Sequence, residues 1–308
     1  MGPYKSINEL SCLEIEYSSF KGPASQAPRS LCLVPAKPLF PLFRPISFCI
    51  LPSMTVGVFG LGRFGSFWAS LLSERFSVLV YDRDPDIKAP KGVRRVSLEE
   101  LCTAPIVFIC VTIRSVPEVL SQIGPLLAPD SVVADTCSVK VLPAKWLSEL
   151  LPKSTPLLAT HPMFGPESAK DGLEGLAIMM DPLRLDGERT QFWEDVFSGF
   201  GLTVVHMTCD EHDREAAYSQ ALTHFVGRSI YRIGLVETPI ATRWYKELYG
   251  VAKQCVRDSH LLFEDMQTLN PYAAGMRHRV LQGFAETLHD LGEPVEWCRK
   301  NKNSGGTL

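Results

Sequence analysis

The sequence predicts an α/β fold, in which a doubly wound parallel sheet is followed by a smaller domain made only of helices. Up to about residue 207, short apolar runs of strand length alternate with helical stretches, which is the pattern of βαβ units. Beyond that point, long helical stretches follow one another without strand alternation. A glycine cluster at residues 60–65 joins the first apolar run to the first helical stretch, which indicates that the parallel sheet is doubly wound.

The glycine cluster has the order of a strand, a tight turn and a helix. An apolar run at residues 55–59 leads into it, and a helical stretch follows at residues 66–74. Its residues are Gly60, Leu61, Gly62, Arg63, Phe64 and Gly65. The first glycine makes the turn, the second lets the backbone approach a pyrophosphate, and the third lets the helix pack closely on the sheet. The free N–H groups of the helix N-terminus favour phosphates. We therefore expect a Rossmann domain that binds a dinucleotide; a turn that binds nothing is the alternative.

Asp82 bears on which dinucleotide is bound. It directly follows the second apolar run, residues 77–81. A carboxylate at the end of the second strand accepts hydrogen bonds from the adenosine ribose and repels a 2′-phosphate. That favours NAD. Arg83 and Arg63 point the other way, because a guanidinium can hold the phosphate of NADP. The expected cofactor is NAD or NADP, with NAD favoured.

The other elements of the first domain continue the alternation. Ser97 and Glu100 form a capping-box pattern, which predicts the start of a helix. Further strands are expected at residues 106–112, 131–135, 156–160, 177–180 and 203–206, and helices at residues 115–127, 142–150 and 189–200. The dinucleotide-binding domain is thus expected to span residues 54–207.

The second domain is expected to span residues 208–293 and to serve substrate binding and dimerisation. Its helical stretches cover about residues 213–233, 245–266 and 271–291. Many apolar positions in a small helical domain suggest burial against a second copy, so we expect a homodimer. The remaining polar tail, residues 294–308, is expected to be flexible.

The composition is that of an ordinary globular chain, with 308 residues, 45% hydrophobic and 21% charged. A formal net charge of −3 offers no electrostatic footprint for nucleic acid. The nine cysteines are an odd number and none forms a Cys-x-x-Cys pair, so neither a disulfide framework nor a metal site is indicated. No apolar run approaches the roughly 20 residues of a membrane span. We expect a reducing, cytoplasmic location and no membrane partner.

Residues 1–53 differ from the rest of the chain in being rich in proline and serine. Prolines interrupt their apolar piece, residues 31–51, which makes it a poor signal peptide or anchor. The segment is either an organelle transit segment, which would place the protein in a plastid, or sequence upstream of a true start at Met54. Acidic residues such as Glu9 and Glu14 favour the second interpretation. Disorder is expected in both cases.

Three further stretches carry chemistry: residues 135–140 (DTCSVK), 160–168 (THPMFGPES) and 220–225 (QALTHF). With the glycine cluster ahead of them, they resemble the prephenate and arogenate dehydrogenases of tyrosine biosynthesis, over about residues 55–291. The second stretch, with Asp171 after it, is most similar to the plant-type arogenate branch. This resemblance implies oxidative decarboxylation of arogenate to tyrosine, or of prephenate to 4-hydroxyphenylpyruvate, by hydride transfer to NAD or NADP.

Ser138 and His161 both follow predicted strands directly, at the edge where a doubly wound sheet binds its ligands. Removal of hydride from a carbinol carbon leaves a hydroxyl proton, and neutral histidine is suited to accept it. The resemblance implies this role for His161; a structural loop histidine is the alternative. Ser138 is expected to hydrogen-bond His161 or the nicotinamide amide, or else to cap a helix. Thr112, at its strand end, is expected to pack beneath the nicotinamide ribose or to cap.

The second domain supplies candidate substrate-binding residues. Gln220 and His224 are four residues apart on a predicted helix face toward the cleft, although His224 could be a buried structural histidine. The substrate carboxylates require cations, for which Arg228 and Arg257 are the candidates. Asp265 stands where many bacterial members of the family have an arginine, which weakens the carry-over of their scheme for binding the carboxylates. Plant-type members also lack that arginine, so activity is not excluded.

Asp171 bears on the choice between the two substrates. Arogenate carries an ammonium where prephenate has a keto group, so a carboxylate in the cleft would favour arogenate. This requires the loop after Gly165 to fold over the site; otherwise Asp171 is a solvated charge. The other histidines are interpreted as structural or exposed: His206, His212, His260, His278 and His289.

Two alternative functions remain open. The β-hydroxyacid dehydrogenases share this architecture, but the nearest match to their lysine and asparagine pair, Lys300 and Asn303, falls in the polar tail. A regulator that binds a dinucleotide without turnover is the other alternative, and Asp265 is its only support.

Overall fold

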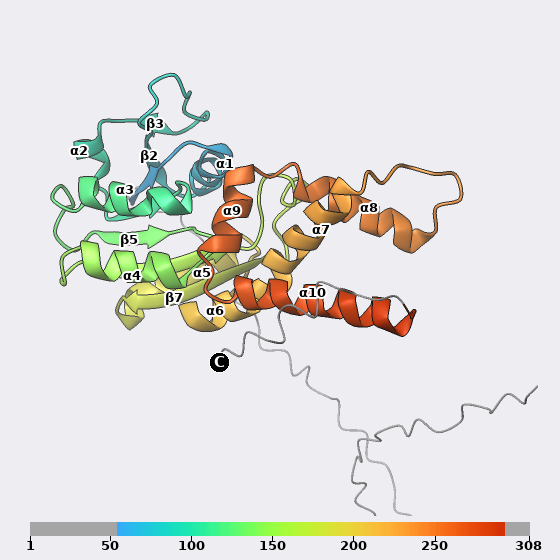
Figure 1. Ribbon diagram of the computed structural model, residues 1–308. Helices are drawn as coiled ribbons and strands as arrows, with labels where there is room; N and C mark the ends of the chain where they lie inside the picture. The colour runs from blue at the N-terminus through green and yellow to red at the C-terminus, as the bar shows by residue number, and fades with distance from the viewer. Residues whose placement is uncertain (1–53, 293–308) are drawn as a thin grey trace, which may run out of the picture. The chain divides into compact units, whose positions relative to one another are not determined.

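An eight-stranded sheet organises the first part of the chain (Figure 1). The computed structural model describes residues 54–292, so the expected extension at residues 1–53 and the expected tail at residues 294–308 lie outside the described residues. No helix in the part of the chain that is described is long and apolar enough to cross a membrane.

The sheet has the strand order β3-β2-β1-β4-β5-β6-β7-β8. Its strands are β1 (Thr55–Phe59), β2 (Ser77–Tyr81), β3 (Arg94–Arg95), β4 (Ile106–Ile109), β5 (Val132–Asp135), β6 (Leu157–Pro162), β7 (Ala177–Arg184) and β8 (Thr203–His206). Neighbouring strands are parallel except β6 and β7, which are antiparallel. The order reverses at β1, which pairs with both β2 and β4, and ligands bind outside the carboxyl ends of the strands at such a point. The predicted fold class is confirmed.

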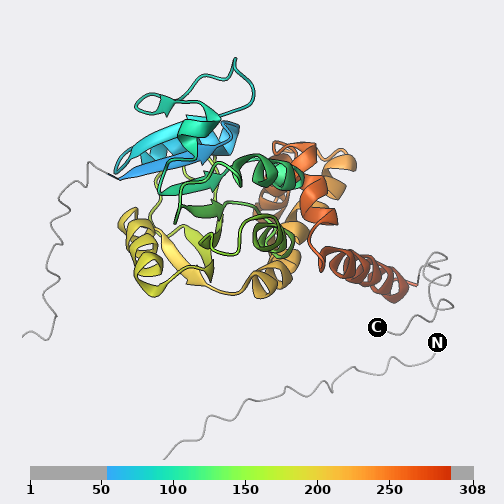
Figure 2. The same cartoon turned by 90° about the vertical axis from the view of Figure 1, so that its left-hand side faces the viewer.

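Helices cover both faces of the sheet (Figures 1 and 2). They are α1 (Arg63–Leu72), α2 (Leu98–Leu101), α3 (Val116–Ile123), α4 (Val141–Leu150) and α5 (Gly187–Gly199). The central strand β4 is fully buried, and its side chains alternate between two cores. Phe108 packs with Trp68 of α1 and Trp193 of α5 in one core, whereas Val107 packs with Leu120 of α3 in the other. This double burial explains why β4 reads as a continuous apolar run.

A helical region follows the last strand. It contains α6 (Cys209–Ala216), the π-helical segment η2 (Ala217–Ala221), α7 (Leu222–Arg232), α8 (Arg243–Cys255), α9 (His260–Thr268) and α10 (Ala273–Asp290). The single helix expected at residues 213–233 is this α6-η2-α7 series, and it begins earlier than expected. Thr208 sets the start, because its side chain and that of Glu211 form a reciprocal capping box.

Three predicted boundaries were wrong in ways that matter for the site. β4 ends at Ile109, and Thr112 instead precedes a short 3₁₀ turn, η1 (Ile113–Ser115). The helix expected at residues 245–266 is interrupted before α9, because the Ser259 side chain accepts the Leu262 N–H and caps a new helix. β6 continues through Pro162, because its antiparallel partner β7 keeps pairing with it to that point.

Candidate active site

The glycine turn after β1 has the geometry of a phosphate-binding loop. Gly60 has a φ of +100°, and a Cβ there would lie 2.5 Å from the Cys110 carbonyl oxygen, so the position requires glycine. A Cβ at Gly65 would lie 1.9 Å from the Gly60 oxygen, so this position requires glycine for α1 to pack this closely against the turn. A Cβ at Gly62 would meet no atom within 4 Å. The space beside Gly62, at the N-terminus of α1, is therefore open to a ligand.

Asp82 is fixed beside this turn. Its carboxylate accepts the backbone N–H of Leu61 at 2.6 Å and that of Asp84 at 2.9 Å. Arg83 is exposed, and Arg63 forms an exposed ion pair of 3.4 Å with Glu167 from the loop after β6. Both arginines of the NADP hypothesis thus lie on the surface near the turn, whereas Asp82 is held in a defined position.

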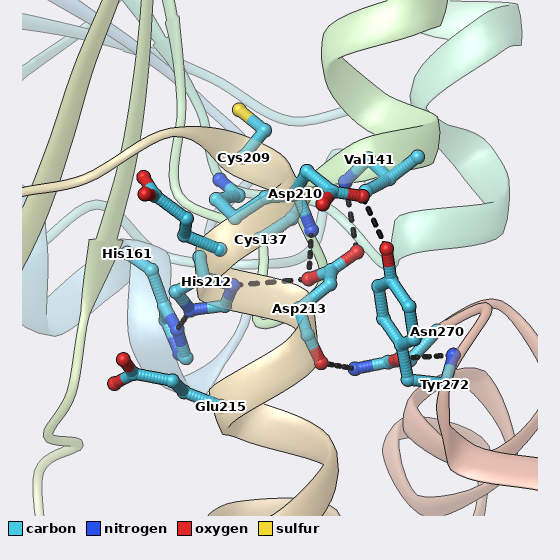
Figure 3. A network of polar contacts seen from close by, with 12 residues as sticks. Cys137, Val141, His161, Cys209, Asp210, His212, Asp213, Glu215, Asn270 and Tyr272 are labelled. Carbon is cyan, nitrogen blue, oxygen red and sulfur yellow. Dashed lines mark hydrogen bonds and ion pairs between the residues drawn. The ribbon is translucent and has the colours of Figure 1, made fainter. Parts of the chain in front are cut away.

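His161 is the centre of a buried polar network at the carboxyl end of the sheet. It lies within β6, not after it as expected, and is 3% exposed. Its Nδ1 is 2.8 Å from Nε2 of His212, which belongs to α6 (Figure 3). The Nδ1 of His212 is in turn 2.9 Å from Oδ1 of Asp213. A relay of two imidazoles and a carboxylate therefore stands behind the candidate base.

Asp213 ties this relay to the start of α4 and to the segment before α10. Its carboxylate accepts the backbone N–H groups of Lys140 at 2.7 Å and Val141 at 2.8 Å, at the start of α4. Its carbonyl oxygen accepts a hydrogen bond of 2.8 Å from Nδ2 of Asn270, just before α10 (Figure 3). The position of α6, and with it that of His212, is thus set from both sides.

A buried ion pair lies beneath the site. Lys140 Nζ contacts Oδ2 of Asp135 and the carbonyl oxygen of Thr160, and both charged side chains are 0% exposed. The Thr160 hydroxyl donates to the Asp135 carbonyl at 2.6 Å. These bonds join the ends of β5 and β6 and fix the backbone that carries His161.

Burial lowers the pKa of His161 well below its ordinary value of 6.5, and the neighbouring His212 and Lys140 lower it further. His161 is therefore neutral at neutral pH, which is the state a general base requires.

Ser138 is available to a ligand. Its hydroxyl oxygen is buried and has no hydrogen-bond partner within the described residues. The capping alternative is wrong, because α4 begins after Lys140 and has no side-chain cap. No hydrogen bond joins Ser138 to His161 either. Thr112 is exposed, and its hydroxyl lies 2.7 Å from that of Ser115.

His224 and Arg228 lie together in α7 but are engaged with the next helices. His224 Nε2 is 3.7 Å from Asp258, and its Nδ1 is buried without a partner in the described region. Burial lowers the pKa of His224. The charge of Arg228 lowers this pKa further, whereas Asp258 raises it. Arg228 donates to the Asp258 carbonyl at 2.7 Å and lies over the Phe263 ring at 4.6 Å. Arg228 thus holds the junction of α8 and α9, a use that the sequence did not predict.

The other candidates have no hydrogen bond or ion pair to the network of His161, His212 and Asp213 within the described residues. Gln220 lies in the π-helical segment η2. The expectation that Gln220 and His224 share a helix face assumed regular α-helical hydrogen bonds, and a π-helix has a different hydrogen-bond pattern. Arg257 lines a cavity of about 500 Å³ beside α8, to which no residue of the His161 network contributes. Asp171 is exposed and has no hydrogen bond or ion pair within the described residues, so it is a solvated loop charge in this structure.

Asp265 has a partner that the sequence did not suggest. It is 1% exposed and pairs with Arg114 of η1 at 2.6 Å, and the partly buried Glu264 lies 3.3 Å from the same guanidinium. This pair connects α9 to η1, which follows β4 of the sheet.

His212, Asp213 and Lys140 are the residues that sequence reasoning missed. Lys140 is the last residue of the stretch at residues 135–140, but nothing in that pattern indicated that its ammonium group is buried. Within residues 54–292, no group of three or more His, Cys, Asp or Glu side chains is arranged to hold a metal ion.

Two family models match the chain. The prephenate dehydrogenase nucleotide-binding domain matches residues 75–186, and a TYRAAT1-like C-terminal domain matches residues 230–302. Among solved structures, Synechocystis arogenate dehydrogenase shares the fold, with a TM-score of 0.60 and 22% identity over 82% of this chain and 98% of that one. Prephenate dehydrogenase from A. aeolicus, in complex with hydroxyphenyl propionate and NAD+, gives a TM-score of 0.61 at 20% identity, over 82% of this chain and 93% of that one.

Two curated relatives come from Arabidopsis thaliana. Arogenate dehydrogenase 1, chloroplastic, is 34% identical over 75% of this chain, which spans 38% of that protein. Arogenate dehydrogenase 2, chloroplastic, is 30% identical over 83% of this chain and 75% of its own length. The expected resemblance is confirmed, and the chain belongs to the family of prephenate and arogenate dehydrogenases.

Proposed function

We propose that this chain catalyses the NAD(P)-dependent oxidative decarboxylation of arogenate to tyrosine, with prephenate as the alternative substrate. The observation that carries the proposal is a buried, neutral His161 whose Nδ1 is already bonded to His212. Its Nε2 is the nitrogen left for a ligand at the carboxyl end of the sheet. The names of the two Arabidopsis relatives support arogenate as the substrate.

The described residues fit a dinucleotide. The open space at Gly62 would take the pyrophosphate at the N-terminus of α1, with the Gly60 and Gly65 backbone beneath it and Arg63 and Phe64 at the helix start. Asp82, beside Arg83, would accept the ribose hydroxyls, which favours NAD. The unpartnered hydroxyl of Ser138 would meet the nicotinamide end near Thr112. When bound, NAD or NADP supplies the hydride acceptor.

His161 would accept the proton of the ring hydroxyl as hydride leaves the carbinol carbon. The ketone formed at that carbon draws the electrons of the breaking carbon–carboxylate bond, so carbon dioxide leaves and the ring becomes aromatic. The proton then returns from His161 to the phenolate oxygen. Asp135 and Lys140 hold the strand ends that position His161.

Substrate binding is assigned to the helical region. His224 and Gln220 would meet the polar groups of the substrate, and Arg228 or Arg257 its carboxylates. Asp171 would reach the arogenate ammonium only after movement of its loop, because the side chain is exposed in this structure. If Asp171→Asn leaves the preference for arogenate over prephenate unchanged, Asp171 has no part in substrate choice.

We also propose a homodimer formed through the helical region. Large hydrophobic side chains are exposed there, as is typical of an interface. They include Ile233, Val236, Ile240, Trp244 and Phe284. Light scattering on the purified chain should give twice the monomer mass, and a monomer would refute the proposal. We propose a cytoplasmic location, or a plastid one if residues 1–53 are a transit segment.

The test of function is formation of reduced cofactor by purified protein, with arogenate and prephenate each combined with NAD and NADP. Turnover with at least one pair, lost in His161→Asn while cofactor binding persists, is the expected result. Cofactor binding without turnover in any combination would refute the proposal and support a dinucleotide-binding regulator.

A further inference from the structure

We propose that His212 and Asp213 are positioning residues that hold His161 in the tautomer with its proton on Nδ1, so that Nε2 is the base. This inference rests on the proposed function for its catalytic meaning, but the tautomer itself can be measured without turnover. The partners of Asp213 fix the direction of each hydrogen bond in the network.

The first step is that Asp213 acts as an acceptor. Its Oδ1 receives the backbone N–H of Lys140 at 2.7 Å, and its Oδ2 that of Val141 at 2.8 Å. Backbone N–H groups can only donate, and an ionised carboxylate can only accept. The same carboxylate lies 2.9 Å from Nδ1 of His212. His212 must therefore carry its proton on Nδ1 and donate it to Asp213.

The second step sets the direction of the bond between the two rings. A neutral imidazole that donates from one nitrogen has only a lone pair on the other. In neutral His212, Nε2 is therefore an acceptor, and it lies 2.8 Å from Nδ1 of His161. Nδ1 of His161 must donate to it. The remaining nitrogen of His161, Nε2, then carries the lone pair that a general base needs.

The third step is that this lone pair is free. Nε2 of His161 has no hydrogen bond to any described residue. This atom is not fully buried, so a ligand can reach it. The two nitrogens of an imidazole point in different directions, so a ring held by Nδ1 presents Nε2 away from His212. The relay thus sets both the protonation and the orientation of His161 before a substrate arrives.

A purely structural role is the competing explanation, because Asp213 also ties α6 to α4. His212 separates the two explanations, since its Nε2 bonds only to His161. His212→Phe removes the acceptor and keeps an aromatic ring of similar size. His212→Gln keeps an amide oxygen that can accept from His161 Nδ1. His278→Phe, at an exposed histidine, is the matched control.

The decisive measurement is the ¹⁵N NMR spectrum of the histidine rings in the full chain, with His161 identified by its loss in His161→Asn. We expect Nδ1 of His161 to be protonated in the wild type and in His278→Phe, and this tautomer to be lost or mixed in His212→Phe. A proton on Nε2 of His161 in the wild type, or an unchanged tautomer in His212→Phe, would overturn the inference.

Kinetics supply the second readout. Loss of correct base protonation should lower kcat of His212→Phe by about 100-fold or more, with KM and cofactor affinity within about threefold of wild type. His212→Gln should recover most of kcat. Equal defects in both variants, with cofactor binding lost, would show a merely structural role. Absence of turnover in the wild type would refute the proposed function, while the NMR result would still decide the tautomer.

Discussion

The buried ion pair beneath the site allows a quantitative test of what holds the strand ends together. Lys140→Met removes the ammonium and fills its space with an apolar chain of similar length. Asp135 is then left as a buried carboxylate that keeps only the backbone N–H of Cys137, at 3.0 Å, on Oδ2, while Oδ1 has no partner among the described residues. Removing one partner of a fully buried pair costs about 3–5 kcal/mol. The expected loss in the free energy of unfolding is in this range.

Urea unfolding followed by fluorescence measures the loss. With a slope of about 2–3 kcal/mol per molar urea, the midpoint should fall by roughly 1–2.5 M. Lys145→Met, at an exposed lysine of α4, is the matched control and should stay within about 0.5 kcal/mol of wild type. Adding Asp135→Asn to Lys140→Met removes the uncompensated charge and should recover about 1–3 kcal/mol. A loss in Lys140→Met no larger than that of the control would refute the reasoning.

Four further predictions follow from the site. Gly65→Ala should abolish measurable NAD binding by calorimetry, because its Cβ would stand 1.9 Å from a carbonyl oxygen of the turn; retained affinity would contradict the geometry. Asp82→Asn should weaken NAD by about 10-fold or more and NADP less, since a charged acceptor for the ribose is lost; equal losses would show that Asp82 does not select NAD. Arg114→Ala should lower the urea midpoint, because the buried carboxylate of Asp265 loses its partner; an unchanged midpoint would show that the pair contributes nothing. The pKa of His161 lies well below 6.5, so its base form persists as pH falls to 6.5; kcat/KM should therefore stay level from neutral pH to 6.5 and decline only below it, and a decline centred above 6.5 would refute this.

What the sequence determined by itself is local. The turn at Gly60 and Gly65 could be predicted because only glycine meets the steric requirements of such a turn, and the glycines stand between an apolar run and a helical stretch in the sequence. The buried strand β4 could be predicted because burial on both faces requires an unbroken apolar run. His161 could be named because it lies in a family motif. Each of these features depends on a short stretch of chain.

Helix continuity was less predictable, because periodicity does not show where hydrogen bonds change their pattern. The π-helical segment at residues 217–221 falls inside a stretch that reads as regular helix. Likewise, the end of α8 is set by Ser259, whose cap competes with helix continuation, and by Arg228, which binds the Asp258 carbonyl from another helix.

Only the tertiary structure decided what surrounds His161. His212 is 51 residues away in the sequence, on a helix whose position depends on Asp213, the start of α4 and Asn270. In the sequence it is one of several histidines without a motif. The same holds for Asp265, which reads as a missing arginine but is paired with Arg114 from 151 residues away. Burial and long-range hydrogen bonds arise when separate elements pack together, so the protonation state and direction of a side chain are properties of the folded chain.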